Sequence, residues 1–230
     1  MNTQLTLEQV KTIQASFINK VYGWMCLALA LTGFVAMRTA SSEVMLSLVF
    51  GSRFGFLGLI IFELGIVWWI SSSIQKISSN LAIGLFLLYS AINGLTLSVL
   101  FLAYTSASIA STFFVTAGTF GVMSAYGYFT KQDLTSWGNL LFMALIGLII
   151  ASVVNIFWNN SFLYWIVTYA GVLIFVGLTA YDTQKIKEMS IKMEIESEEG
   201  RKGAIMGALA LYLDFINMFI FLLRIFGNRR

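Results

Sequence analysis

The sequence contains no histidine and no proline among its 230 residues. Without histidine, Ser-His and Cys-His catalytic pairs, histidine ligation of haem and most catalytic zinc sites are excluded. Without proline, no helix is broken by a pyrrolidine ring, so any kink must come from the 19 glycines or from serine and threonine. These two absences remove the commonest forms of enzyme chemistry and favour helices that proline does not interrupt.

Cysteine and charge are also scarce. The single cysteine, Cys26, excludes an internal disulfide, and its place in an apolar run predicts a small buried side chain. Only 11% of the residues are charged, against roughly 25% in an ordinary soluble domain, while 58% are hydrophobic. Because a water-soluble fold needs charge to cover its surface, lipid must solvate much of this one. The net charge of +3 reflects basic loop residues and gives no reason to expect a nucleic-acid partner.

Seven stretches are long and apolar enough to cross a hydrocarbon layer of roughly 30 Å, which takes about 20 residues in a helix. They are Val21–Met37, Phe54–Ser73, Leu81–Leu102, Ile109–Phe129, Leu140–Trp158, Phe162–Tyr181 and Ala204–Phe226. The sequence therefore predicts an all-α membrane protein with seven transmembrane helices. Residues 1–20 are polar and of mixed charge, so we expect a cytoplasmic N-terminal segment, not a cleavable signal peptide, ahead of one transmembrane domain over 21–230.

The distribution of basic residues predicts the orientation. The one long polar segment, 182–203, is expected to be a solvated cytoplasmic loop. With seven spans, nine of the 14 basic residues lie on the N-terminal side and five on the other, which places the N-terminus in the cytoplasm. The basic end of the chain opposes this trend, and a re-entrant Ala204–Phe226 would make the division twelve against two. The length of that segment favours a full crossing.

Three acidic residues lie within or at the end of predicted spans, where a charge is costly unless it faces protein or water. Glu63 lies in the middle of the second span, and Asp182 lies at the cytoplasmic end of the sixth. Asp214 follows Ala204 by about ten residues, which places it roughly 15 Å along the last helix. These three acids are the candidate functional residues.

A tilt or a later start of the last helix would bring Asp182 and Asp214 together. Two neighbouring carboxylates resist double ionisation, so the pair is a candidate pH sensor, proton relay or cation site. Structural explanations stay open for each acid. Asp182 could be an interfacial acid, and Asp214 could belong to a hydrogen-bond network with Tyr212 and Asn217. Glu63 could be a protonated packing group.

Three runs of residues surround these positions: Ala210-Leu-Tyr-Leu-Asp-Phe-Ile-Asn217 continued by Phe221-Leu-Leu-Arg-Ile-Phe-Gly227, Ala180-Tyr-Asp-Thr-Gln-Lys-Ile186, and Ala91-Ile-Asn-Gly-Leu-Thr-Leu97. They resemble the last-helix, sixth-helix and third-helix motifs of the Bax inhibitor family, also called the transmembrane Bax inhibitor motif family. The resemblance covers the chain from the first span onward and is similar to the bacterial inner-membrane branch. It implies six helices packed around a central seventh.

The resemblance also implies a function, a pH-sensitive calcium leak channel of the cell inner membrane. Its di-aspartyl sensor would be Asp182 and Asp214, and Glu63 corresponds to a glutamate of helix two. The two aspartates would hold a permeating calcium ion weakly, and no cofactor is expected. Membrane lipid and cations are the expected partners, and no protein partner is specified. The residues expected to support the acids are Tyr181, Tyr212, Asn217 and Asn93.

One element of the family pattern differs here. In a bacterial relative, an arginine near the cytoplasmic end of helix two pairs with the sixth-helix aspartate and latches the pore. The corresponding run, Ser71-Ser-Ser-Ile-Gln-Lys76, contains no arginine, and Lys76 is the basic residue that could take its place.

Other classes of function remain open at this stage. One is an interaction protein that transports nothing and modulates other membrane proteins or stress responses. A proton-coupled antiporter is a close variant of the channel. An intramembrane aspartyl protease would use Tyr181-Asp182, but Tyr212-Leu-Asp214 lacks the Gly-x-Gly-Asp pattern of its second half. We therefore expect no enzymatic activity.

Overall fold

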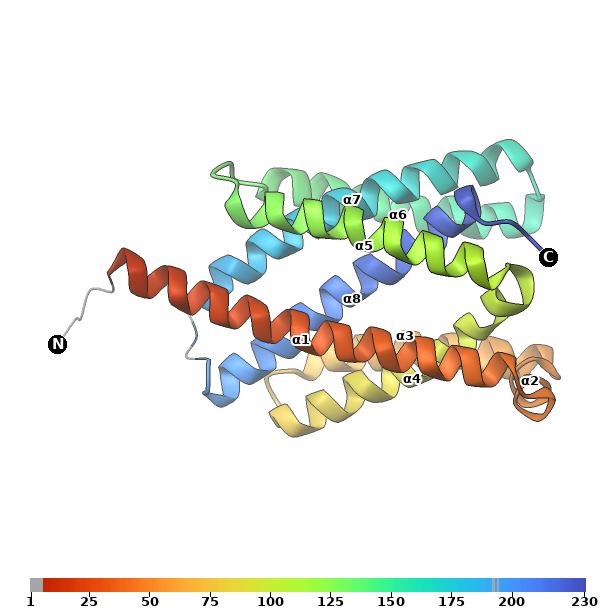
Figure 1. Cartoon of the computed structure of the whole chain (residues 1–230), viewed down its shortest axis with the longest axis horizontal. Coiled ribbons are helices and arrows are strands. Elements are labelled where there is room, and N and C mark those ends of the chain that lie inside the picture. The colour runs from red at the N-terminus through yellow and green to blue at the C-terminus, as the bar shows by residue number, and fades with distance from the viewer. Residues whose placement is uncertain (1–5, 192, 194) are drawn as a thin grey trace. The chain divides into compact units, whose positions relative to one another are not determined.

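The computed structural model describes residues 6–191, 193 and 195–230. Within them the chain forms eight α-helices, labelled in Figure 1. Their bounds are α1 Leu7–Ala40, α2 Glu43–Phe50, α3 Arg53–Ser73, α4 Ser79–Ala103, α5 Ser106–Phe129, α6 Thr135–Trp158, α7 Ser161–Ser190 and α8 Glu198–Phe226. Residues 1–5 of the expected N-terminal segment, and 192 and 194 of the expected loop, lie outside the described residues.

Serine and threonine side chains begin the helices of a chain that has no proline. Thr6 and Gln9 form a reciprocal capping box at the start of α1. Ser42 caps α2, Ser52 caps α3 and Thr105 caps α5, each by accepting a hydrogen bond from a backbone N–H of the first turn. The starts of these four helices are therefore set by short polar side chains, whereas Leu134, which precedes α6, provides no side-chain cap.

Seven of the eight helices are long and apolar enough to cross a membrane, which confirms the predicted all-α architecture and the number of spans. The exception is α2, whose eight residues lie between the first two spans and were not expected from hydropathy. In the apolar stretch of α8, 72% of the residues are buried inside the structure. The corresponding share is at most 44% in any other span. Such enclosure is the property that a central seventh helix must have.

Three helices, α1, α7 and α8, extend beyond the predicted spans into polar sequence. Helix α1 already begins at Leu7, so most of the expected N-terminal segment 1–20 is helical. Helix α7 continues to Ser190 and α8 begins at Glu198, so most of the expected loop 182–203 is helical as well. Hydropathy reports where hydrocarbon ends, whereas lysine and glutamate are good helix formers that continue a helix into water.

The chain divides into two compact units. The first contains the described residues up to Ala103 together with Lys187–Leu209 and Arg230. Helix α4 packs against both α1 and α3 in this unit. The approach of α1 to α4 is close at Gly94, where a Cβ would lie 2.7 Å from the carbonyl oxygen of Thr32. The hydroxyl of Thr32 also donates a 2.8 Å hydrogen bond to the carbonyl of Ser90.

The second unit contains Tyr104–Ile186 and Ala210–Arg229. Phe215 of α8 packs its ring against Phe113 and Phe120 of α5, with centroids 5.4 and 5.6 Å away. Near the other end of α8, the guanidinium of Arg224 lies 5.6 Å from the ring centroid of Tyr164. The residues after α8 pair with Tyr104 through an antiparallel bridge to Arg229. These contacts hold the C-terminal half of α8 against α5 and α7.

Candidate functional site

Asp182 and Asp214 both belong to the second unit and interact directly. Their side chains lie within hydrogen-bonding reach of each other, Asp182 on α7 and Asp214 on α8. Asp214 is only 4% exposed, whereas Asp182 is partly exposed. The structure thus brings together the two acids that the sequence placed on neighbouring spans.

Contacts on both sides of Asp182 fix its turn of α7. The ring of Tyr181 lies against Gly138 of α6 so closely that a Cβ at position 138 would overlap it. Thr183 donates to the carbonyl of Thr179 at 2.8 Å. Gln184 accepts a 2.8 Å bond from the N–H of Leu134 and donates one to the carbonyl of Gln132, so its amide fastens α7 to the α5–α6 connection. The Asp182 carboxyl is therefore carried on a rigid segment.

Asp214 lies in a largely apolar environment on α8. The neighbouring side chains of Tyr212 and Phe215 are buried. The Oδ2 atom of Asp214 is buried and has no hydrogen-bond partner in the described part of the chain. Asn217 donates its amide to the carbonyl of Leu213 at 2.8 Å, within its own helix. A hydrogen-bond network between Asp214 and Asn217 was considered above. The amide nitrogen of Asn217 instead bonds to a carbonyl of its own helix.

The positive charge of Lys185, one turn further along α7, acts electrostatically on Asp182. Its ammonium lies 5.7 Å from the ring centroid of Tyr181. Among the described residues, neither aspartate makes an ion pair within 4.0 Å. The expected substitute latch, Lys76, lies exposed in the turn after α3, and no ion pair of its side chain is found in the described ranges. The pair is therefore held by its own contact and by packing.

The third acid, Glu63, lies in the first unit in a separate polar cluster between α3 and α4. It is 8% exposed, and its Oε1 accepts a 2.6 Å hydrogen bond from the hydroxyl of Thr96. Asn93 is a second hydrogen-bonding neighbour of Glu63, and its amide lies 3.5 Å from the hydroxyl of Tyr89. Tyr89, Asn93 and Thr96 are spaced i, i+4, i+7, so they share one face of α4.

The sequence interpretation named Glu63 and Asn93 but missed Thr96 and Tyr89 as their partners. The available signal was that i, i+4, i+7 spacing of polar groups in an otherwise apolar span. A polar stripe of this kind inside a membrane helix indicates that the stripe faces protein.

Replacing Thr96 with valine tests this cluster. Valine keeps the shape of the side chain but removes the donor to Glu63, so an oxygen of a buried carboxyl loses its partner. We expect a loss of about 1–3 kcal/mol in the free energy of unfolding, measured by denaturation in detergent micelles. Thr119→Val is the matched control, because within the described residues the Thr119 hydroxyl donates to the carbonyl of Val115 in its own helix and to no other group. Equal stability of the two variants would contradict the role of Thr96.

Known proteins resemble this chain over most of its length. A family model described as inhibitor of apoptosis-promoting Bax1 matches residues 14–230. The inner membrane protein YbhL of Escherichia coli strain K12 is 55% identical over 216 residues, which cover 94% of this chain and 92% of that protein. A protein of Borreliella burgdorferi is 45% identical over 218 residues, covering 95% and 94%. A protein of Deinococcus radiodurans is 43% identical over 230 residues, covering 100% and 96%.

The family match begins within α1 and continues through the other six long helices. On that match, and on relatives aligned over nearly their whole length, the chain belongs to the Bax inhibitor family.

Proposed function

We propose that this protein is a pH-sensitive cation leak pathway of the bacterial inner membrane, and that calcium is the permeating ion. The observation that carries the proposal is the direct contact of the Asp182 and Asp214 carboxyl groups, one of them buried in the most enclosed span. A hydrogen bond between two carboxyl groups needs a proton, because two carboxylates only repel each other. Protonation therefore favours the paired arrangement, and ionisation favours its separation.

The chemistry of the pair suits passage of a hard cation more than its storage. A tight calcium site has six to eight oxygen ligands, which in many proteins come from a single calcium-binding loop. In the described residues no group of three or more acidic, histidine or cysteine side chains is assembled. Two aspartates would thus form a weak, transient binding site for calcium. Glu63, held by Thr96, is the second acidic position on the proposed pathway.

The test is calcium flux into proteoliposomes that contain the purified protein. We expect a flux that exceeds that of protein-free liposomes and differs between acid and neutral pH, because an interacting pair of acids takes up and releases protons as a unit. An imposed proton gradient that drives calcium against its own gradient would instead favour an antiporter. Absence of flux at every pH would contradict the proposal and favour an interaction protein.

We also propose the orientation predicted by the basic residues, with the N-terminus in the cytoplasm. The name of the related inner membrane protein YbhL supports the choice of membrane, and the orientation depends on the distribution of basic residues alone. Cys26 is the only cysteine, and it is exposed on α1 where the sequence predicted burial, so Cys26→Ser gives a cysteine-free background. Single cysteines at Glu8 and Asn228 are expected to react with an impermeant maleimide from opposite sides of the membrane. Labelling of both from one side would exclude seven crossings.

A further inference from the structure

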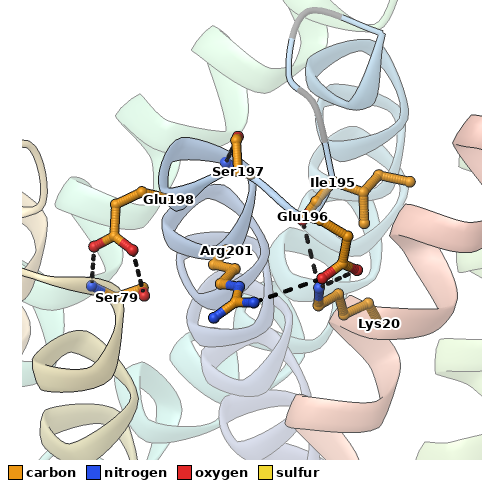
Figure 2. A network of polar contacts seen from close by, with 8 residues as sticks. Lys20, Ser79, Ile195, Glu196, Ser197, Glu198 and Arg201 are labelled. Atoms are coloured by element: carbon orange, nitrogen blue, oxygen red, sulfur yellow. Dashed lines mark hydrogen bonds and ion pairs between the residues drawn. The ribbon is translucent and has the colours of Figure 1, made fainter.

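A polar network in the first unit joins the start of α8 to α1 and α4. Figure 2 shows its two carboxylates, Glu196 and Glu198, which come from the α7–α8 connection and the first turn of α8. Each contacts a group on a different helix. We call the network the α7–α8 strap, and its members are Lys20, Ser79, Glu196, Glu198, Arg201 and Lys202.

The first arm of the strap runs to α1. The ammonium of Lys20 lies 3.1 Å from Oε1 of Glu196 and also donates to the carbonyl of Ile195 at 3.4 Å. Arg201, one turn into α8, lies 3.7 Å from the other carboxylate oxygen of Glu196. The carboxylate of Glu196 therefore lies between a cation of α1 and a cation of α8.

The second arm runs to the first turn of α4 and is more specific. Oε1 of Glu198 accepts a hydrogen bond from the backbone N–H of Ser79, and Oε2 accepts one from the Ser79 hydroxyl at 2.7 Å. The first N–H groups of a helix have no partner within the helix and attract negative charge. Ser78 caps the N–H of Leu81, and Glu198 satisfies the N–H of Ser79, another donor that the first turn of α4 leaves open.

Lys202 completes the second arm. Its ammonium lies 3.9 Å from Oε1 of Glu198 and 3.5 Å from the carbonyl of Gln75, in the turn before α4. Its side chain is only 14% exposed, unlike the exposed Glu196. Because the Glu198 contacts combine two hydrogen bonds, a helix terminus and a partly buried cation, they are the strong part of the strap.

We propose that the α7–α8 strap regulates the leak pathway by holding the first turn of α8 on α1 and α4 in the closed state. The proposal rests on the function proposed above. Helix α8 is continuous from Glu198 to Phe226, and the same helix carries Asp214. A displacement of α8 that separates Asp214 from Asp182 must therefore move or break the contacts of Glu198.

The strap differs from the aspartate pair in the stimulus to which it responds. The hydrogen bond from Lys20 lowers the pKa of the Glu196 carboxyl. A lowered pKa means that this contact is fully present at neutral pH and is lost only when the pH falls through the lowered value, in the acid range. Its ion pairs are exposed enough to be screened by salt. Salt should therefore loosen the strap at a pH where protons do not.

The experiment compares Glu198→Ala, Glu198→Gln and the control Glu199→Gln, an adjacent exposed glutamate, in the full-length protein. Two quantities are measured: hydrogen exchange at the amides of Ser79 to Leu81, and calcium flux at neutral pH. Loss of hydrogen bonds to a charged acceptor should raise exchange about tenfold in Glu198→Ala. We expect a smaller rise in Glu198→Gln, which keeps one acceptor oxygen, and none in the control.

Flux at neutral pH should rise in the same order, and added salt should raise flux in the unaltered protein by screening the Glu196 ion pairs. Unchanged exchange at Ser79 in Glu198→Ala would overturn the strap itself. Faster exchange with unchanged flux would overturn the regulatory role and leave the proposed leak function standing. Absence of flux in the unaltered protein would refute the leak function, and the regulatory proposal with it.

Discussion

Asp214→Asn is expected to abolish the pH dependence of calcium flux, so that the ratio of flux at neutral pH to flux at acid pH falls to about one. Asparagine is nearly the same size as aspartate and can still hydrogen-bond to Asp182, but it cannot take up or release a proton in this range. The buried Asp214 is the group whose change of charge costs most, because water cannot reach it. Removing that charge should therefore remove the proton switch while leaving the helix packed.

Asp182→Asn should cause the same loss, because a coupled pair titrates as one unit. Asp133→Asn is the matched control. Asp133 lies in the exposed α5–α6 connection, and hydrogen bonds from Thr135 lower the pKa of its carboxyl. It is therefore ionised throughout the pH range of the assay, and its loss should leave the pH response intact. A pH-dependent flux in Asp214→Asn, with normal thermal unfolding, would contradict the sensor assignment.

Gly94→Ala is expected to lower the free energy of unfolding by about 1–3 kcal/mol, the usual range for overpacking a filled core. The added methyl group would lie 2.7 Å from the carbonyl oxygen of Thr32 and 2.8 Å from the Cβ of Val35, both on α1. Neither atom is the end of a flexible side chain, so α1 must move away from α4. That movement also weakens the bond from Thr32 to Ser90.

Gly84→Ala is the control, because it adds the same methyl group to the same helix. A Cβ at Gly84 meets nothing within 4 Å, and alanine is the better helix former by roughly 1 kcal/mol. We expect unchanged or higher stability for this variant, measured by thermal unfolding in the same detergent. If the two variants unfolded alike, α1 and α4 would not be packed as closely as the structure places them.

The spans were predictable from the sequence because hydropathy measures the property that defines them. The ends of the helices were not. The polar residues around Lys187 and Arg201 favour water, and this preference is compatible with either a loop or a helix that leaves the bilayer. Likewise α2, with eight residues, is too short to be found by a search for membrane spans. Its capping residue Ser42 does not by itself indicate the start of a helix. Helix boundaries depend on hydrogen bonds between residues that the sequence does not pair.

The candidate site was predictable in part for the same reason. Asp182 and Asp214 stand out because acids are rare in apolar spans, and their contact agrees with the expectation that they meet. Their role as a sensor stays a prediction. The partners of Glu198 and Glu63 were not predictable, because serine and threonine are common in membrane helices and only packing selects Ser79 and Thr96. Asn217 was expected to support the acids, and its amide nitrogen donates within its own helix, because proximity in sequence does not fix where an amide points.

The uninterrupted course of α8 has a consequence for the size of the motion that the protein needs. Asp214 follows Glu198 by sixteen residues, which is about 24 Å along the axis at 1.5 Å per residue. Successive side chains of an α-helix are about 100° apart around that axis. A rotation of α8 by a fraction of this angle would turn the Asp214 carboxyl away from Asp182 without any change in depth. Rotation of the first turn about the helix axis would thus separate the two carboxyl groups through a continuous, stiff helix.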